Sequence, residues 1–451
     1  MLFVPTRDRA PALAMALRSH RAALQRRGVS LPIVVIDDST SEAPNAAACA
    51  ETNSVHFGRA DRTFLARGLA RTADEREALA FALIPPAVRT ATWVGATRNA
   101  AALLGAGGTF ASIDDDSTSH FWEPKARWIA KRASDPEPTD LVDPSDLATV
   151  ASDPWSPHAA LLGRRVDTHV DPTAPPALRI AMTFLGVFGD LGLGSPGQLA
   201  FLTGASRARL AGGLLHHVLA GGRAARLART TQPSLFPFGM MGAFGADASA
   251  MLPPCFPVGR NEDGLFTLLL RVIDPHACLV HLPLAVAHRL HDVRRVSWSS
   301  FAVVAATPRI TDLARLVAAR GFAACEAGAP ATRLSSIARA FGADLPTLTE
   351  LTHLWNFQRD RYANQLVDNA RECPQGDLHD AMQAMAAALR VTASIEERVD
   401  GMPVLETLAR YGRLLHVWPE VWSRAARERR GLEATMSCAR RVVSRPASCG
   451  A

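Results

Sequence analysis

The sequence predicts an α/β protein in which a mostly parallel sheet is flanked by helices and followed by an all-helical C-terminal region. Strand and helix patterns alternate over the first part of the chain, as is typical of parallel sheets with helices on both faces. Acidic residues follow two of the predicted strands, and the chain beyond about residue 305 has helical spacing almost throughout. We therefore expect two units, residues 1–304 and residues 305–451.

The N-terminal unit shows the alternation most clearly. Short apolar or β-branched runs bounded by polar turns predict strands, and apolar residues spaced three or four apart predict helices. Residues 135–176 are rich in Pro, Asp and Ser, and they predict a long loop or an excursion of the chain. The remaining signals predict strands at residues 2–5, 32–36, 54–57 and 109–113, and helices at residues 11–27, 61–83 and 98–104.

The C-terminal unit has a different pattern, dominated by Ala, Leu and Arg with few strand signals. Its large aromatic side chains fall at helical spacings, which is typical of a packing face. Because so much apolar area is unfavourable in water, we expect these helices to pack on the N-terminal unit. The aromatic residues concerned are Trp355, Tyr362, Trp418 and Trp422.

The composition is typical of a globular protein without a transmembrane segment. Of the 451 residues, 48% are hydrophobic, and the mean hydropathy is +0.05. The best apolar run, residues 180–193, is too short to cross a bilayer and contains Asp190. The first residues lack the basic segment of a signal peptide, and the seven cysteines form no C-x-x-C pair. We therefore expect a cytoplasmic protein with reduced thiols.

The net charge of +6 does not by itself predict nucleic-acid binding. The only lysines are Lys125 and Lys131, and no basic run is interleaved with aromatic residues that could stack on bases. Residues 191–246 contain no acidic residue but several arginines, which predicts either a surface that favours an anionic substrate or a solvated helix face. These arginines are Arg207, Arg209, Arg223, Arg226 and Arg229.

Three consecutive carboxylates follow the predicted strand at residues 109–113, and they are the strongest indication of function. Asp114, Asp115 and Asp116 repel one another, so the fold gains nothing from them without a cation. In an extended segment Asp114 and Asp116 point to the same face. Two carboxylates on one face suit a divalent metal that keeps other positions for water or substrate phosphate. A solvated acidic turn is the alternative interpretation.

Four further motifs accompany the acidic triplet in a fixed order. They are Val-Pro-Thr-Arg-Asp-Arg at residues 4–9, Val-Val-Ile-Asp-Asp-Ser at 34–39, Gly-Ala-Thr-Arg-Asn at 95–99 and Asn-Glu-Asp-Gly-Leu-Phe at 261–266. With the triplet, they resemble the motifs of GT-A-fold glycosyltransferases, most closely the inverting family-two type. The resemblance covers roughly residues 1–295. It implies a GT-A-like fold, a nucleotide-sugar donor and a divalent metal, Mn²⁺ or Mg²⁺.

The resemblance also implies a donor site. Asp38 would accept a hydrogen bond from the nucleotide base or the ribose, and Arg98 would bind phosphate at a helix start. The alternative for this helix start is that Asn99 caps the helix and Arg98 is solvated. The predicted donor-binding residues are Pro5, Thr6, Arg7, Asp37, Asp38, Arg98, Asn99, Asp114 and Asp115.

The metal-ligating residues implied by the resemblance come from two distant segments. Asp116 would be the direct ligand, with Asp114 beside it on the metal or on the ribose. His288 follows a late apolar run and resembles the histidine that some GT-A enzymes add to the metal. His291 is an alternative ligand, and a hydrogen-bonded structural histidine is the alternative role.

An inverting transfer requires a base that deprotonates the acceptor hydroxyl as it attacks. Asp263 resembles the base of the family, and Glu262 lies next to it. Taken alone, Asn-Glu-Asp-Gly is also a common surface turn. The acceptor stays open between a glycan, a peptide and a small metabolite.

Two other functions remain as alternatives. Asp114-x-Asp116-x-Thr118 also matches the nucleophile loop of haloacid-dehalogenase-like phosphatases, but Lys125 and Lys131 lie too close to supply the separate lysine of that site. A non-catalytic GT-A-like protein that binds nucleotide or acts as a scaffold is the other alternative. The intact acidic triplet argues against it, because a site without metal would tend to lose such mutual repulsion.

Overall fold

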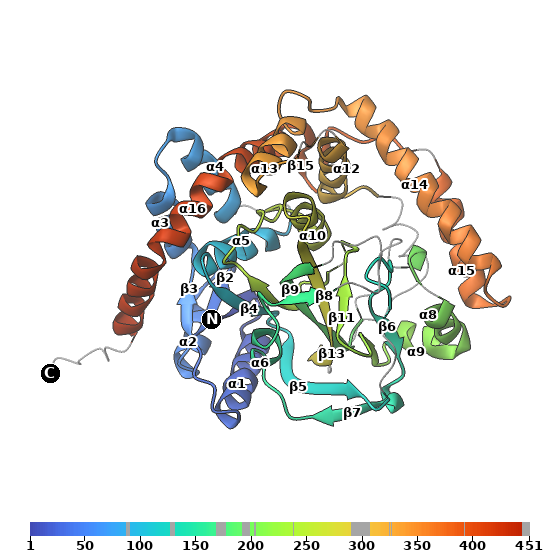
Figure 1. Ribbon diagram of the computed structural model, residues 1–451, viewed down its shortest axis with the longest axis horizontal. Helices are drawn as coiled ribbons and strands as arrows, with labels where there is room; N and C mark the ends of the chain where they lie inside the picture. The colour runs from blue at the N-terminus through green and yellow to red at the C-terminus, as the bar shows by residue number, and fades with distance from the viewer. Residues whose placement is uncertain are drawn as a thin grey trace.

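The protein is an α/β structure in which a mixed sheet lies between helices (Figure 1). The C-terminal part, drawn in orange and red, is helical apart from one small hairpin. The α/β class and the helical C-terminal region are therefore confirmed, except that this region also contains two short strands. The computed structural model describes residues 1–86, 91–126, 131–167, 177–191, 199–202, 204–237, 239–289, 307–323, 325, 327–391 and 393–443.

The central sheet contains β1 (Leu2–Thr6), β2 (Ile33–Asp37), β3 (Val55–Phe57), β4 (Thr109–Ile113), β9 (Ala177–Gly189), β12 (Ala243–Asp247) and β13 (Ala277–His288). Their spatial order is β3-β2-β1-β4-β12-β9-β13. β12 is antiparallel to both of its neighbours, whereas all other neighbouring pairs are parallel, so six of the seven strands share one direction. Their carboxyl ends lie at one edge of the sheet, which is where such sheets bind ligands.

Further short strands extend this sheet beyond β13 and beside β9. Three of them, with the 3₁₀ helix η1 and the short helix α6, lie within residues 135–176, so the described part of this segment is not one long loop. Strands of three or four residues are too short to show a periodic pattern in the sequence. They form because they pair with neighbouring strands, as β8 does with β9. The added elements are β5 (Ser117–Pro124), β6 (Asp140–Val142), η1 (Pro144–Asp146), β7 (Leu147–Val150), α6 (Ser156–Ala159), β8 (Arg165–Asp167), β10 (Ala224–Leu227) and β11 (Gln232–Ser234).

The N-terminal helices are α1 (Ala10–Arg26), α2 (Ala43–Glu51), α3 (Arg59–Leu69), α4 (Ala73–Leu83) and α5 (Val94–Gly105). They cover both faces of the sheet, because successive residues of a strand point to opposite sides. Leu2 and Val4 of β1 belong to the core with α1 and α2, whereas Phe3 belongs to the core with α3, α4 and α5. The helix predicted at 61–83 is divided into α3 and α4, since Thr72 caps α4 by accepting a hydrogen bond from the backbone of Glu75.

The C-terminal helices share an apolar core with the sheet, across the predicted boundary at residue 304. In α16, Trp418 is fully buried and donates its indole N–H to the carbonyl of Leu252 at 2.7 Å. Tyr411 donates its hydroxyl to the carbonyl of Pro254 at 2.8 Å. The elements are α12 (Ile310–Ala323), α13 (Pro330–Ala340), α14 (Leu348–Arg371), α15 (Asp377–Arg390), β14 (Arg398–Val399), β15 (Met402–Pro403) and α16 (Val404–Val443).

A second apolar cluster joins α14 and α15 to a short helical segment. That segment consists of α8 (Gly204–Arg209), η2 (Leu210–Leu214) and α9 (Leu215–Leu219). Tyr362 packs at this cluster, 6.1 Å from Phe201 between ring centroids, whereas Trp355, Trp418 and Trp422 belong to the main core. No helix in the described part of the chain is long and apolar enough to span a membrane.

Two buried histidines make the folded protein sensitive to acid. Nδ1 of His20 lies 2.7 Å from the hydroxyl of Ser119, and Nδ1 of His158 lies 2.7 Å from that of Thr183. Burial lowers the pKa of each histidine to about 3. Since the unfolded chain takes up these protons near pH 6.5, the stability that each histidine contributes should fall as the pH drops below that value, by about 2 kcal/mol at pH 5. Proton uptake by Asp114 and Asp115 in the folded protein acts in the opposite direction.

Urea unfolding at pH 7.5 and pH 5 measures this effect. The variants His20→Gln and His158→Gln should each lose part of the pH dependence, because Gln does not titrate. A pH dependence unchanged in both variants would contradict the expectation.

Candidate functional site

The predicted acidic motifs meet at the carboxyl edge of the sheet. Thr6 ends β1, Asp37 ends β2, and the triplet Asp114–Asp116 follows β4, which is parallel to β1. The hydroxyl of Thr6 donates to Oδ2 of Asp115 at 2.6 Å, which joins the first motif to the triplet. His288 ends β13 at the same edge, because β13 runs in the direction of β4.

Each carboxylate of the triplet has a different set of partners. Oδ1 of Asp114 lies 3.6 Å from the guanidinium of Arg98. Nη1 of Arg9 lies 3.2 Å from Oδ1 of Asp115 and 2.7 Å from Oδ2 of Asp116. Protein cations thus compensate the repulsion that the sequence indicated.

Burial and neighbouring charges give the three aspartates of the triplet different pKa values. Burial raises the pKa of Asp114 to about 7 and that of Asp115 to about 6. Burial also opposes ionisation of Asp116, but the contact with His288 and the charges of Arg9 and Arg289 outweigh it and lower the pKa of Asp116 to about 2. Asp116 is therefore the carboxylate of the triplet that stays ionised most readily.

His288 faces Asp116 at the acidic edge. Nδ1 of His288 lies 2.7 Å from the backbone carbonyl of Asp190, which can only accept, so Nδ1 carries a proton. Nε2 then presents a lone pair toward Oδ1 of Asp116 at 3.4 Å, unless it is protonated as well. That Oδ1 is buried and has no hydrogen-bond partner of good geometry among the described residues.

A proton or a metal ion can satisfy these two facing acceptors. A proton is favoured in the chain alone: burial lowers the pKa of His288, but the hydrogen bond and charge of Asp116 outweigh burial and raise it. A carboxylate and an imidazole also form a donor pair that fits a divalent metal. Among the described residues, no group of three or more His, Cys, Asp or Glu side chains is arranged to hold a metal ion. The predicted alternative ligand, His291, lies outside the described residues.

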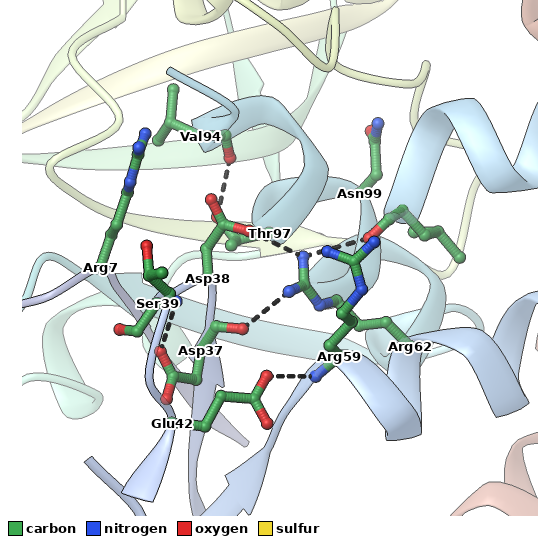
Figure 2. Close-up of polar contacts among 12 residues, drawn as sticks. Arg7, Asp37, Asp38, Ser39, Glu42, Arg59, Arg62, Val94, Thr97 and Asn99 are labelled. Carbon is green, nitrogen blue, oxygen red and sulfur yellow. Dashed lines mark hydrogen bonds and ion pairs between the residues drawn. The ribbon is translucent and has the colours of Figure 1, made fainter. Parts of the chain in front are cut away.

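The acidic pair after β2 is held by other side chains (Figure 2). Asp37 is fully buried and accepts hydrogen bonds from the backbone of Ser39, from Asn45 and from His56. Its role is therefore to shape the loop, and it is not exposed to a donor. Oδ1 of Asp38 accepts from Nη1 of Arg62 at 3.2 Å.

Arg62 is buried and fixes this loop from the side of α3. It also donates to the carbonyl oxygens of Asp37 at 2.8 Å and Leu83 at 3.1 Å. Arg7 extends past Asp38 and Ser39 in Figure 2, and its side chain is 35% exposed. Arg7 is thus a predicted donor-binding residue whose charge remains accessible.

The Gly-Ala-Thr-Arg-Asn motif at the start of α5 holds the segment around Cys255 in place. The sequence analysis instead predicted that this motif contacts the donor. A Cβ on Gly95 would lie 1.9 Å from the carbonyl oxygen of Phe256, so only glycine permits this close approach. Asn99 accepts from the backbone N–H of Cys255 at 2.7 Å and donates to its carbonyl at 3.0 Å. Because a further bond to Ala82 completes its set, buried Asn99 is not available to a donor.

Arg98 joins the donor side to the predicted acceptor side. It is buried, contrary to the solvated alternative, and donates to the carbonyl of Met241 at 2.6 Å and to Oε1 of Glu262 at 3.1 Å. Arg98 also contacts Asp114, so its guanidinium lies between the triplet and the start of α10 (Glu262–Ile273). Arg98 therefore orders protein carboxylates in this structure.

Glu262 and Asp263 occupy the first turn of α10 in different environments. Asn261 precedes them with φ 72°, a left-handed turn that Asn tolerates. Burial and the neighbouring charge of Asp263 raise the pKa of Glu262, whose side chain is held by Arg98. Asp263 is half-buried and accepts from the backbone N–H of Gly264 at 2.8 Å. Of the two, Asp263 has the more accessible carboxylate.

Two arginines at this edge were missed by the sequence analysis. Arg9 lies in the first motif, and its position one turn beyond the predicted strand could have indicated contact with the triplet. Arg62 carries no such signal, because a buried arginine on α3 has the same local pattern as a solvated one.

The basic segment and the lysines lie elsewhere. Nζ of Lys125 donates to the carbonyl of Ser145, and Nζ of Lys131 lies 2.9 Å from Asp140, so neither orients an aspartyl group at the triplet. Several arginines of residues 191–246 are paired by the fold, which disfavours an anionic-substrate surface there. These pairs are Arg207 with Glu372, Arg209 with Asp146, Arg226 with Glu137 and Arg229 with Asp140.

Comparison with known proteins assigns no family to this arrangement. No family model matches the chain, and no curated protein matches it either.

Proposed function

We propose that this protein is a metal-dependent, inverting glycosyltransferase that moves a sugar from a nucleotide-diphosphate donor to an acceptor hydroxyl. One observation carries the proposal: Asp116 and His288 converge at the carboxyl edge of the sheet, with Oδ1 of Asp116 lying 3.4 Å from Nε2 of His288. These two side chains come from the turn after β4 and from the end of β13, distant in sequence, and converge beside the other predicted motifs.

On the donor side, Asp116 and His288 would hold the metal, with Asp114 next to them. A divalent metal supplies Lewis-acid stabilisation of the diphosphate leaving group. Arg7, whose side chain is 35% exposed and lies 3.6 Å from Asp8, can add a hydrogen bond to phosphate. Asp38 is buried against Arg62, so it holds the loop after β2 and does not contact the donor. Asp37 and Asn99 support this side without contacting the donor.

On the acceptor side, Asp263 is the base. Its carboxylate takes the proton of the acceptor hydroxyl while that oxygen forms a bond to the sugar C1 and the bond from C1 to the diphosphate breaks. Attack from the face opposite the leaving group inverts C1. Glu262 is held by Arg98 and positions this turn of α10.

A second candidate is a non-catalytic GT-A-like protein that binds nucleotide or acts as a scaffold. Its support is that the chain's own cations already compensate the triplet. Binding of UDP, GDP, ADP and CDP, with and without Mn²⁺, followed by release of nucleoside diphosphate from the matching sugar donors, distinguishes the two. Binding without release under any condition would favour the second candidate.

The variant Asp116→Ala should abolish metal-dependent nucleotide binding, because it removes the most readily ionised carboxylate of the triplet. The fold should persist, since the change also removes repulsion. Thermal shift with each nucleotide and Mn²⁺ measures the effect. Glu51→Ala removes a carboxylate that is 59% exposed on α2 and should retain the full shift. An undiminished Mn²⁺-dependent shift in Asp116→Ala would refute the metal assignment.

A further inference from the structure

Arg9 occupies the acidic edge in a way that resembles a bound cation. A single nitrogen, Nη1, lies 3.2 Å from Oδ1 of Asp115 and 2.7 Å from Oδ2 of Asp116. It therefore bridges two carboxylates, as a metal ion bridges oxygen ligands. The side chain is nevertheless 45% exposed.

The turn between β1 and α1 places Arg9 at this position. Asp8 has φ 52°, which is uncommon for a residue other than glycine. Its backbone N–H donates to Oγ of Ser39 at 2.7 Å, and its Oδ1 accepts from the N–H of Thr40 at 2.9 Å. The loop after β2 thus fixes the turn, and Arg9 follows it directly.

The two arginines at the triplet differ in how easily they can leave it. The side chain of Arg98 is 7% exposed and is also bound by Met241 and Glu262, so its removal would leave buried groups unpaired. Arg9 is half-exposed, and its guanidinium donates to Asp115 and Asp116 at the edge of the sheet. Water can solvate it after release at modest cost.

The guanidinium lies on Oδ2 of Asp116, so a divalent metal on Oδ1 of the same carboxylate would bring two positive charges close together, and these charges repel each other. We propose that Arg9 is an intrinsic counter-ion that competes electrostatically with the divalent metal at Asp116, so that metal binding tightens when its side chain moves away. This inference rests on the proposed function, because it takes Asp116 as a metal ligand. The competition keeps the metal affinity of the chain low until the side chain of Arg9 has moved.

Mn²⁺ binding to the full chain without nucleotide tests the proposal. The EPR signal of free Mn²⁺, titrated against protein, gives the dissociation constant. Arg9→Gln should bind Mn²⁺ roughly tenfold more tightly than the unchanged chain, because the competing charge is gone. Arg9→Met, which keeps the aliphatic stem, is a second variant with the same expected direction should Arg9→Gln fold poorly.

Two controls define where the metal binds. Arg18→Gln removes a charge from α1, the helix that follows Arg9, at a position paired with Glu51, and should leave Mn²⁺ affinity within about twofold. Asp116→Ala in the Arg9→Gln background should abolish the gain, which places the ion on the acidic edge.

The other outcomes separate this inference from the proposed function. Equal or weaker Mn²⁺ binding by Arg9→Gln and Arg9→Met overturns the competition while leaving the metal site intact. A gain that survives Asp116→Ala also overturns it, because the ion would then bind elsewhere. Absence of Mn²⁺ binding in every variant, with and without nucleotide, overturns both the competition and the metal dependence of the proposed reaction.

Discussion

Replacement of Asp263 by Asn should lower glycosyl transfer by roughly 10²-fold or more, with donor affinity nearly unchanged. Asn keeps the shape of the side chain, and its Oδ1 can still accept the hydrogen bond from Gly264. It cannot take a proton from the acceptor hydroxyl. Initial rates with the donor found by nucleotide screening, together with thermal shift for donor binding, measure the two effects separately.

Glu262→Gln is the matched comparison, because it changes the neighbouring carboxylate in the same way. Glu262 is buried against Arg98, so this variant should disturb the first turn of α10 and affect stability more than the proton transfer. A kinetic loss confined to Glu262→Gln would show that the base is one residue earlier. Loss of donor binding in Asp263→Asn would instead place Asp263 in the donor site.

The strand ends at the acidic edge were predictable from the sequence for a physical reason. Parallel strands buried on both faces appear as continuous apolar runs, and residues 33–36 and 109–113 have this pattern. The polar residues that follow must then lie at one edge. The observed strands β2 and β4 match the predicted runs to within about one residue, and Asp37 and Asp114–Asp116 lie at the same edge of the sheet as expected.

The partners of these residues were much less predictable. Arg98 was expected to face a phosphate, but its contacts with Met241 and Glu262 depend on where α10 packs, which no local pattern specifies. The same is true of Asn99, whose hydrogen bonds go to a segment around Cys255. Side chains that hold distant backbone have the same residue types as ligand-binding side chains, so a motif alone does not separate the two roles.

Replacement of Trp418 by Ala should lower the free energy of unfolding by about 3–5 kcal/mol. The indole is fully buried in the core shared by α16 and the sheet, so Ala leaves a large cavity. The change also leaves the carbonyl of Leu252 without its hydrogen bond. Urea unfolding followed by tryptophan fluorescence and by circular dichroism measures the loss.

Two further variants separate these contributions. Trp418→Phe keeps most of the apolar volume but removes the indole N–H, so it should cost about 1–3 kcal/mol. Phe357→Ala changes an aromatic residue of α14 that is 65% exposed and should cost less than about 0.5 kcal/mol. Because α16 and the sheet share one core, all probes should report a single transition that moves as a whole. Two transitions, of which Trp418→Ala shifts only one, would show that the C-terminal helices fold as a separate unit.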